Sequence, residues 1–232
     1  MIIEMHCHTA EHSSCSTVSA VDLAQRCFAK GVQGLALTDH HYLWPDSELD
    51  DLRRQLAVPD YFLLFSGQEV TTADFGDVLV YGAPAPIAKG TPLADIRARY
   101  PEAALVWSHP YRRGVHPSPE RLLDQRLDGI EIFNSNHTIT ENHRALRDWH
   151  HFKFTALGGT DTHAESYTAT YPTLFDHPVR TIGELAAEIR QGRCRPYFLE
   201  IPRSGTSDTV VMELALGTDQ EGKSRQTVVV KT

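Results

Sequence analysis

The chain has 232 residues, of which 41% are hydrophobic and 22% charged, so it is long enough for one globular domain with a substantial core. Its formal net charge of −8 disfavours a generic binder of duplex DNA or anionic membranes, and no apolar run approaches membrane-spanning length. The four cysteines show no CxxC spacing, and no signal peptide precedes them, so we expect a reduced, cytoplasmic protein.

Short β-like runs alternate with helical stretches along the first 200 residues. The expected strands are Met1–Met5, Leu35–Thr38, Tyr61–Ser66, Asp77–Tyr81, Ala103–Trp107, Ile130–Phe133 and Phe154–Leu157. The expected helices are Val18–Lys30, Asp46–Leu56, Pro92–Arg99, Pro119–Asp124, Glu141–His151 and Thr181–Arg190. This alternation predicts an α/β domain with a mostly parallel sheet or barrel of seven strands.

The last part of the chain, residues 201–232, differs in character. Two apolar segments, TVVMELAL and QTVVV, are separated by the polar stretch GTDQEGKSR. We predict that these segments pair antiparallel. The resulting tail is expected to pack on the barrel or to form a subunit interface in a homo-oligomer.

Polar side chains with metal-ligand chemistry follow five of the seven expected strands. Side chains two residues apart on a strand point to the same face, so His6 and His8 can bind one cation together. His12 follows the same strand, and the further strand ends carry Asp39, His40, His41, Glu69, His109, Asp161 and His163. Because catalytic residues of parallel barrels gather at the carboxyl ends of strands, we predict that these groups form a metal cluster. Nitrogen and oxygen ligands suit Zn, Mn or Fe without choosing among them.

Over residues 1 to about 200, the chain resembles the PHP (polymerase and histidinol phosphatase) family. The motifs that carry the resemblance are, in chain order, HCH, TDH, a glutamate, SHP and GTDTH. The resemblance implies a distorted seven-stranded (β/α) barrel, TIM-like, with two or three divalent metal ions and hydrolysis of phosphate esters. Glu69 is the implied bridge between metals, and Asp161 and His109 are implied to share its catalytic role. The implied metal ligands are His6, His8, His12, His40, Glu69, His109, Asp161 and His163.

One departure from the family pattern concerns the fourth strand. Members with three metals often carry a histidine near its end, where this chain has LVYGAP, and Gly82 and Ala83 cannot ligate through side chains. Either the third site is weak or absent, or His41, His116 or His137 replaces the ligand. The neighbouring Asp39 is expected to orient His40 rather than to bind metal.

Arg112 and Arg113 follow His109 in a loop that should overhang the metals, where a guanidinium could hold a substrate phosphate through paired donors. The leading hypothesis is a histidinol-phosphatase-like phosphomonoesterase in which metal-bound hydroxide attacks a small phosphorylated substrate. The alternative is a nucleotide or oligonucleotide phosphodiesterase or exonuclease, although no long basic tract indicates an extended nucleic-acid strand. A non-catalytic, metal-stabilised scaffold barrel is the third hypothesis.

Overall fold

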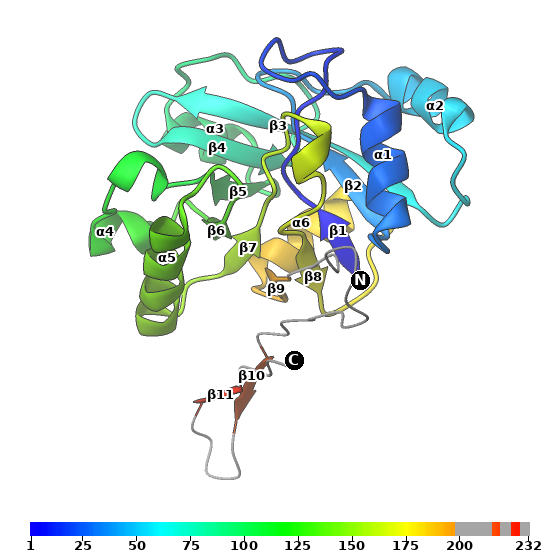
Figure 1. The fold of residues 1–232 in the computed structure, drawn as a ribbon. Helices are drawn as coiled ribbons and strands as arrows, with labels where there is room; N and C mark the ends of the chain where they lie inside the picture. The colour runs from blue at the N-terminus through cyan, green and yellow to red at the C-terminus, as the bar shows by residue number, and fades with distance from the viewer. Residues whose placement is uncertain (198–214, 219–223, 228–232) are drawn as a thin grey trace.

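The structure, a computed structural model, describes residues 1–197, 215–218 and 224–227 (Figure 1). One sheet has the strand order β7-β6-β5-β4-β3-β2-β1-β8-β9. Its strands are β1 (Ile2–Glu4), β2 (Gly34–Leu37), β3 (Leu63–Thr72), β4 (Gly76–Tyr81), β5 (Ala104–Trp107), β6 (Gly129–Phe133), β7 (Ala156–Gly158), β8 (Thr173–Phe175) and β9 (Cys194–Pro196). Strands β1–β3 are parallel, as are β5–β7, whereas β4 is antiparallel to both of its neighbours.

The sheet curls into a nearly closed barrel, because the strands at its two ends, β7 and β9, lie against each other (Figure 1). The α/β prediction is confirmed, but the sheet has nine strands rather than seven and is mixed. Residues 73–75 alone join β3 to β4, which is too short for the crossover that a parallel pair needs. The two extra strands, β8 and β9, have three residues each, which is too short for alternation to identify them in the sequence.

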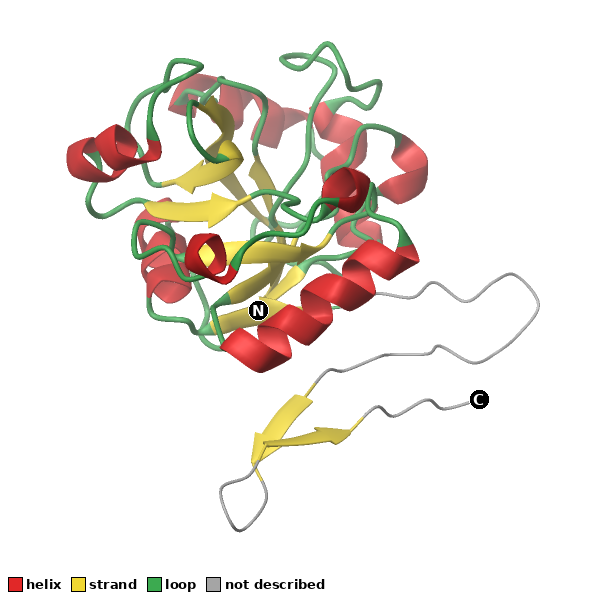
Figure 2. Ribbon diagram, turned by 90° about the vertical axis from the view of Figure 1, so that its left-hand side faces the viewer, coloured by secondary structure: helices red, strands yellow, loops and turns green. Residues whose placement is uncertain are grey.

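Helices cover the outside of the barrel, as Figure 2 shows. They are α1 (Ala20–Ala29), α2 (Asp46–Gln55), α3 (Leu93–Arg99), α4 (Pro119–Leu122), α5 (Ile139–Phe152) and α6 (Ile182–Arg190). Hydroxyl side chains begin three of them: Ser19, Thr138 and Thr181 each accept a hydrogen bond from a backbone N–H of the first turn. Because Ser19 is a cap, α1 begins two residues later than expected.

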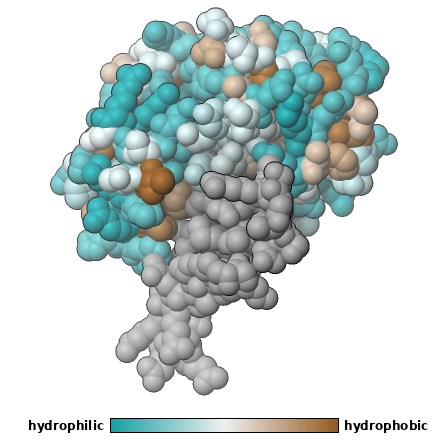
Figure 3. Space-filling view, viewed as in Figure 1, coloured by the Kyte–Doolittle hydropathy of each residue, from teal (hydrophilic) through white to brown (hydrophobic). Residues whose placement is uncertain are grey.

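The core consists of apolar side chains between the sheet and these helices. Every residue of β2, β5 and β6 is buried, as expected for central strands covered on both faces. The face seen in Figure 3 is mostly hydrophilic, with apolar residues scattered over it. Among the described residues, no helix is both long and apolar enough to cross a membrane.

In the C-terminal tail, β10 (Ala215–Thr218) and β11 (Ser224–Thr227) form a separate two-stranded antiparallel sheet. The predicted antiparallel pairing is therefore confirmed where the structure describes the two segments. Most of TVVMELAL and QTVVV, and the domain boundary near residue 200, lie outside the described residues. A role of the tail at a subunit interface stays a prediction.

Candidate metal centre

The first strand delivers two histidines to the barrel interior. His6 and His8 are fully buried on one side of the chain, whereas Cys7 points the other way and donates its thiol to Ala36 O at 3.2 Å. The backbone here also bridges to the last motif, since His8 N donates to Thr162 O at 3.0 Å and Asp161 N donates to His6 O at 2.8 Å. The first and last motifs are therefore held side by side.

Four side chains converge at the centre of this region. His6 Nε2 and His8 Nε2 lie 3.1 Å apart. Asp161 Oδ1 lies 3.5 Å from the first nitrogen and 3.2 Å from the second. Glu69 Oε1 is 3.4 Å from His6 Nε2, and Glu69 Oε2 is 3.3 Å from His8 Nε2. The ligand atoms of His6, His8 and Asp161 can thus face one cation.

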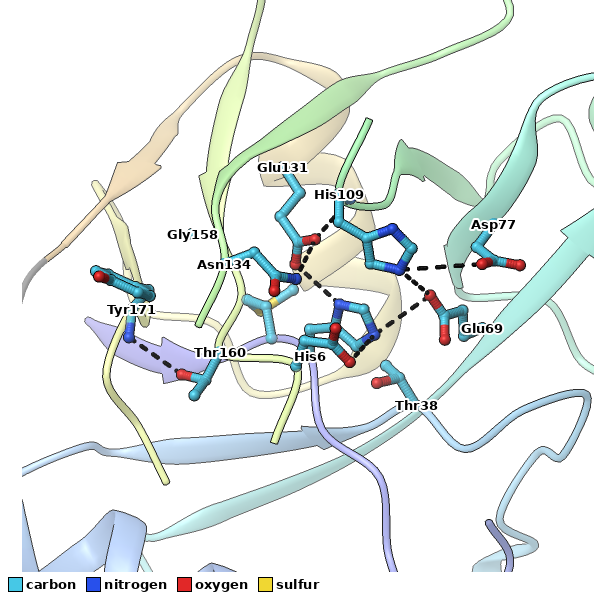
Figure 4. Close-up of polar contacts among 12 residues, drawn as sticks. His6, Thr38, Glu69, Asp77, His109, Glu131, Asn134, Gly158, Thr160 and Tyr171 are labelled. Carbon is cyan, nitrogen blue, oxygen red and sulfur yellow. Dashed lines mark hydrogen bonds and ion pairs between the residues drawn. The ribbon is translucent and has the colours of Figure 1, made fainter. Parts of the chain in front are cut away.

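Glu69, near the end of β3, uses its two oxygens in different directions. Oε1 lies 3.1 Å from His109 Nε2, and Figure 4 shows this contact beside the one to His6. Oε2 lies 3.1 Å from His40 Nδ1. A carboxylate that faces separate groups of imidazoles through separate oxygens has the position that a bridge between two ions requires.

A second group of possible ligands consists of Glu69, His109 and Asp77, whose ligand atoms lie within 4.8 Å of one another. Asp77 lies at the start of β4, and Thr71 donates to its Oδ1 at 2.7 Å. Asp77 was not predicted as a ligand, because the ligand of the fourth strand was expected at its carboxyl end. Since β4 runs antiparallel, its amino end lies beside His109 instead.

A third group consists of His8, Cys15, His40 and His163, again with ligand atoms within 4.8 Å of one another. Cys15 was not expected here. The loop places His12 elsewhere: its Nε2 lies 2.8 Å from Glu48 Oε2, and its ring stacks on Tyr42 with centroids 3.7 Å apart. The structure therefore does not bring His12 into any of the three groups.

None of the three proposed replacement ligands joins these groups. His137 Nδ1 lies 3.0 Å from Asn142 Oδ1, His116 lines a neighbouring cleft, and His41 has no hydrogen-bond partner at Nδ1. From β4, Asp77 joins the second group instead.

A buried acid, Glu131, forms hydrogen bonds with two of the histidine residues on the side away from the candidate metal. Glu131, on β6, accepts from His6 Nδ1 at 2.9 Å, from His109 N at 2.7 Å and from Asn134 Nδ2 at 2.9 Å (Figure 4). A proton held on Nδ1 leaves the lone pair of His6 Nε2 free for a metal. Gly159 makes room for this carboxylate, because a Cβ there would overlap Glu131 Oε1.

Asp39 has a different role from the one expected. Its carboxylate accepts from Thr9 N at 2.7 Å, from Ser13 Oγ at 2.5 Å and from Trp44 Nε1 at 2.8 Å, rather than from the His40 ring. Ser13 Oγ in turn lies 3.5 Å from His8 Nδ1. Asp39 therefore organises the loop after β1, and through it the surroundings of His8.

Two of the converging residues have unusual backbone conformations. His109 has φ 30° and Asp161 has φ 55°, both in the left-handed region that non-glycine residues rarely adopt. Asn136 Nδ2 donates to Asp161 O at 3.0 Å and to its Oδ2 at 2.8 Å, which holds this conformation. Strain of this kind concentrates at functional sites.

The ionisable groups strongly perturb one another. Burial lowers the pKa of His6, but the charges of Glu131, Asp161 and Glu69 outweigh burial and raise it well above the usual range. Burial raises the pKa of Glu69, but the opposite effect of His6 and hydrogen bonds from His109 and His6 hold it well below the usual range. Such coupled shifts are typical of active sites and metal centres.

The outer histidines differ from the inner ones. Burial lowers the pKa of His40 and of His163, so both rings are neutral at pH 7 and can ligate a metal. His8 is the opposite case: burial lowers its pKa, but hydrogen bonds with Asp161 and Glu69 raise it to about 9.

A cleft opens beside the second group. Its lining includes Asp77 and His109 of that group, together with Arg112, Arg113, His116 and Arg121. Arg112 Nη1 lies 3.6 Å from Asp161 Oδ2, so this guanidinium contacts the centre itself. Arg113 lines the cleft without a contact to the candidate ligands. The cleft therefore presents positive charge next to the candidate metal centre.

These residues fit divalent metal ions. Two imidazole nitrogens 3.1 Å apart that also face two buried carboxylates form a donor set for a cation. Buried carboxylates such as Glu69 and Asp161 also need compensating positive charge. The sequence-predicted ligands His6, His8, His40, Glu69, His109, Asp161 and His163 all lie within the three groups.

Comparison with known proteins gives structural matches only. No protein-family model matches the chain, and no curated protein is significantly similar to it in sequence. PsfC from Pseudomonas syringae has a TM-score of 0.65 at 16% identity, over 85% of this chain and 91% of that one. A two-domain protein from Bacteroides vulgatus, described as containing a predicted PHP-like metal-dependent phosphoesterase, has a TM-score of 0.64 at 19% identity, over 85% of this chain and 64% of that one.

A third similar structure is the lesion-specific endonuclease PfuEndoQ from Pyrococcus furiosus, with a TM-score of 0.58 at 15% identity, over 88% of this chain and 60% of that one. The chain thus spans less than two thirds of the length of the second and third proteins. At these identities the likeness is one of fold. The resemblance to the PHP family that the motifs indicate therefore extends to the fold, and this chain has a fold similar to that of a PHP-like phosphoesterase domain.

Proposed function

We propose that the protein is a metal-dependent hydrolase of phosphate esters. The observation that carries this proposal is the convergence of three groups of ligand atoms on His8 and Glu69. His8 belongs to the first and third groups, and Glu69, a member of the second group, has its Oε2 3.3 Å from His8 Nε2 and 3.1 Å from His40 Nδ1. The groups provide places for two or three ions, and their mainly nitrogen and oxygen donors suit Zn, Mn or Fe. His12 is left out of this ligand set because it pairs with Glu48.

When bound, such ions activate water and neutralise charge that develops on a phosphoryl group. The residues of the chain position the reacting groups. Glu131 holds the proton of His6 Nδ1 and thereby keeps Nε2 directed at the centre. Arg112, 3.6 Å from Asp161, can hold a phosphoryl oxygen beside the ligands, and Arg113 can hold one in the cleft.

We propose a small phosphomonoester as the substrate, in the manner of a histidinol phosphatase. A dianionic monoester carries the charge that best matches two guanidinium groups beside a cationic centre. The cleft that begins at His109 and Asp77 offers room for the alcohol part of the ester.

The second candidate is a phosphodiesterase that acts on nucleotides or oligonucleotides. It is favoured by the cleft, whose lining includes Arg112, Arg113 and Arg121 besides His109 and which could hold a phosphate backbone. The similarity of the fold to an endonuclease agrees with this candidate.

One screen tests both candidates. The protein is stripped of metal, reconstituted with Zn, Mn or Fe, and assayed in parallel on phosphate monoesters, diesters and short oligonucleotides. We expect metal-dependent release of phosphate from a monoester, and loss of both metal and turnover in His8→Ala and Asp161→Ala. Folded protein that takes up no metal with any of the three ions would refute the proposal, as would hydrolysis unaffected by both substitutions.

A further inference from the structure

Cys15 lies in the third group of candidate ligands and gives it a chemistry that the other two lack. Its Sγ and one ring nitrogen each of His8, His40 and His163 lie within 4.8 Å of one another. His8 is shared with the first group, because its Nε2 also faces Asp161 and Glu69. Cys15, His40 and His163 belong to the third group alone.

The loop around Cys15 is held in place on both sides. Ser13 on one side donates to Asp39 Oδ1 at 2.5 Å. On the other side, Ser16 Oγ donates to His8 O at 2.8 Å, and Thr17 N donates to His163 O at 3.0 Å. Two of these anchors are backbone groups of other members of the third group, so the position of Cys15 relative to their rings is set by the fold.

The other cysteines are in a different situation. Cys7, Cys27 and Cys194 are buried among apolar side chains, and no disulfide forms among the four. Cys15 is exposed and is the cysteine of the described residues that lies among imidazole rings. A thiolate is a soft ligand that favours Zn²⁺, Co²⁺ or Fe²⁺ over Mn²⁺ or Mg²⁺.

We propose that Cys15 is a metal ligand, and that with His40 and His163 it forms a sulfur-containing site selective for Zn²⁺-like ions. This inference rests on the proposed function, because the site belongs to the same centre. It assigns different metal preferences within one centre: the groups around Asp161 and Asp77 offer nitrogen and oxygen, whereas this one offers nitrogen and sulfur. Cys15 also supplies the donor that His12, paired with Glu48, does not.

Cobalt substitution tests the proposal without an activity assay. Metal-free protein is loaded with Co²⁺, and the near-ultraviolet spectrum is recorded for the wild type, Cys15→Ser and Ser14→Ala. Ser14 is an exposed neighbour on the same loop and is the matched control. We expect a sulfur-to-cobalt charge-transfer band in the wild type and in Ser14→Ala that is absent in Cys15→Ser. A further variant, Cys15→Ala, leaves no donor atom at this position, and we expect it to bind one ion fewer per chain.

Thiol protection gives a second readout. Iodoacetamide should alkylate Cys15 in the metal-free chain, and Zn²⁺ should slow this reaction at least tenfold, whereas Mn²⁺ should not. Mass spectrometry of peptides identifies the modified cysteine.

The outcomes separate this inference from the proposed function. A wild type that binds two or more Co²⁺ ions without a sulfur band, or with a band that persists in Cys15→Ser, overturns the cysteine ligand alone. Alkylation of Cys15 at the same rate with and without Zn²⁺ also overturns it. A folded wild type that binds no Co²⁺ and no Zn²⁺ overturns the metal-dependent function as well.

Discussion

Asp77 Oδ2 lies 4.0 Å from His109 Nε2, although the two residues come from opposite ends of neighbouring strands. Asp77 is the second residue of β4, whereas His109 follows the end of β5. The antiparallel pairing of Val78 with Trp107 places these two ends side by side. An antiparallel strand in an otherwise parallel part of the sheet therefore contributes a residue from its amino end, rather than from its carboxyl end, to the candidate centre.

Asp77→Asn tests the second group of ligands. The amide keeps the shape of the side chain but removes its charge, so we expect metal at this site to bind about tenfold or more weakly, as loss of even a supporting group costs that much. Elemental analysis after dialysis should show one ion fewer per chain. Asp74→Asn, on the same hairpin, is the control, because an amide oxygen can still accept from Leu93 N. Equal metal content in both variants would exclude Asp77 as a ligand.

Glu131→Gln tests the support of His6. The amide removes the charge that faces His6 Nδ1 and brings an N–H₂ group towards the donors of His109 and Asn134. We expect metal affinity to fall about 10- to 100-fold in a calorimetric titration. Glu188→Gln is the control, since Glu188 is a buried acid on α6 that pairs with Arg193 and lies away from the centre. A similar loss of affinity in both variants would contradict a specific role for Glu131.

The two arginines beside His109 should differ. Arg113→Ala should leave metal content unchanged and lower kcat/KM by about ten- to a hundredfold, which corresponds to about 1.5–3 kcal/mol for a lost charge-assisted hydrogen bond. Arg112→Ala should lower kcat/KM similarly and also alter metal affinity, because Arg112 contacts Asp161. The deficit should be larger for a dianionic monoester than for a diester.

Arg54→Ala, at an exposed ion pair on α2, provides the baseline for these kinetics. Unchanged kinetics in Arg112→Ala, Arg113→Ala and the double variant would assign both arginines to the solvated surface.

Metal uptake should depend on pH through His8. Its pKa is raised to about 9, so the metal-free chain holds a proton there below pH 9, and a metal must displace that proton to bind. Affinity should therefore increase as the pH rises from 6 to 8, by about tenfold per unit for each proton released. Calorimetry in buffers of different ionisation enthalpy measures this proton release directly. Metal affinity that stays constant over this range would contradict the protonated state of His8.

Much of the centre could be predicted because strand alternation is a local property. HCH shows from spacing alone that His6 and His8 share a face, and the structure places both in the barrel interior with Cys7 opposite. The meeting of Glu69, His109 and Asp161 followed from the rule that the carboxyl ends of parallel strands share one end of a barrel.

The remaining ligands depend on features without periodicity. The direction of β4 depends on the short link of residues 73–75 and on Gly76, whose φ of 76° is typical of a hairpin, but the ligand of this strand was expected at its carboxyl end. The loop after β1 has no repeating pattern, so nothing in its spacing chooses Cys15 over His12. That choice is made by tertiary contacts, in which Asp39 holds Ser13, and Glu48 pairs with His12.

The position of β1 between β2 and β8 has a consequence for biosynthesis. Ile3 pairs with Gly34 on one side, which emerges from the ribosome soon after it, and with Thr173 on the other, which emerges much later. Asp161 and His163, which complete the first and third ligand groups, also lie late in the chain. Domains are synthesised from the N-terminus, so His6 and His8 wait on the nascent chain for most of translation without these partners. We therefore expect metal loading to follow release of nearly the whole barrel sequence, so that ion availability acts on the finished domain rather than on the growing chain.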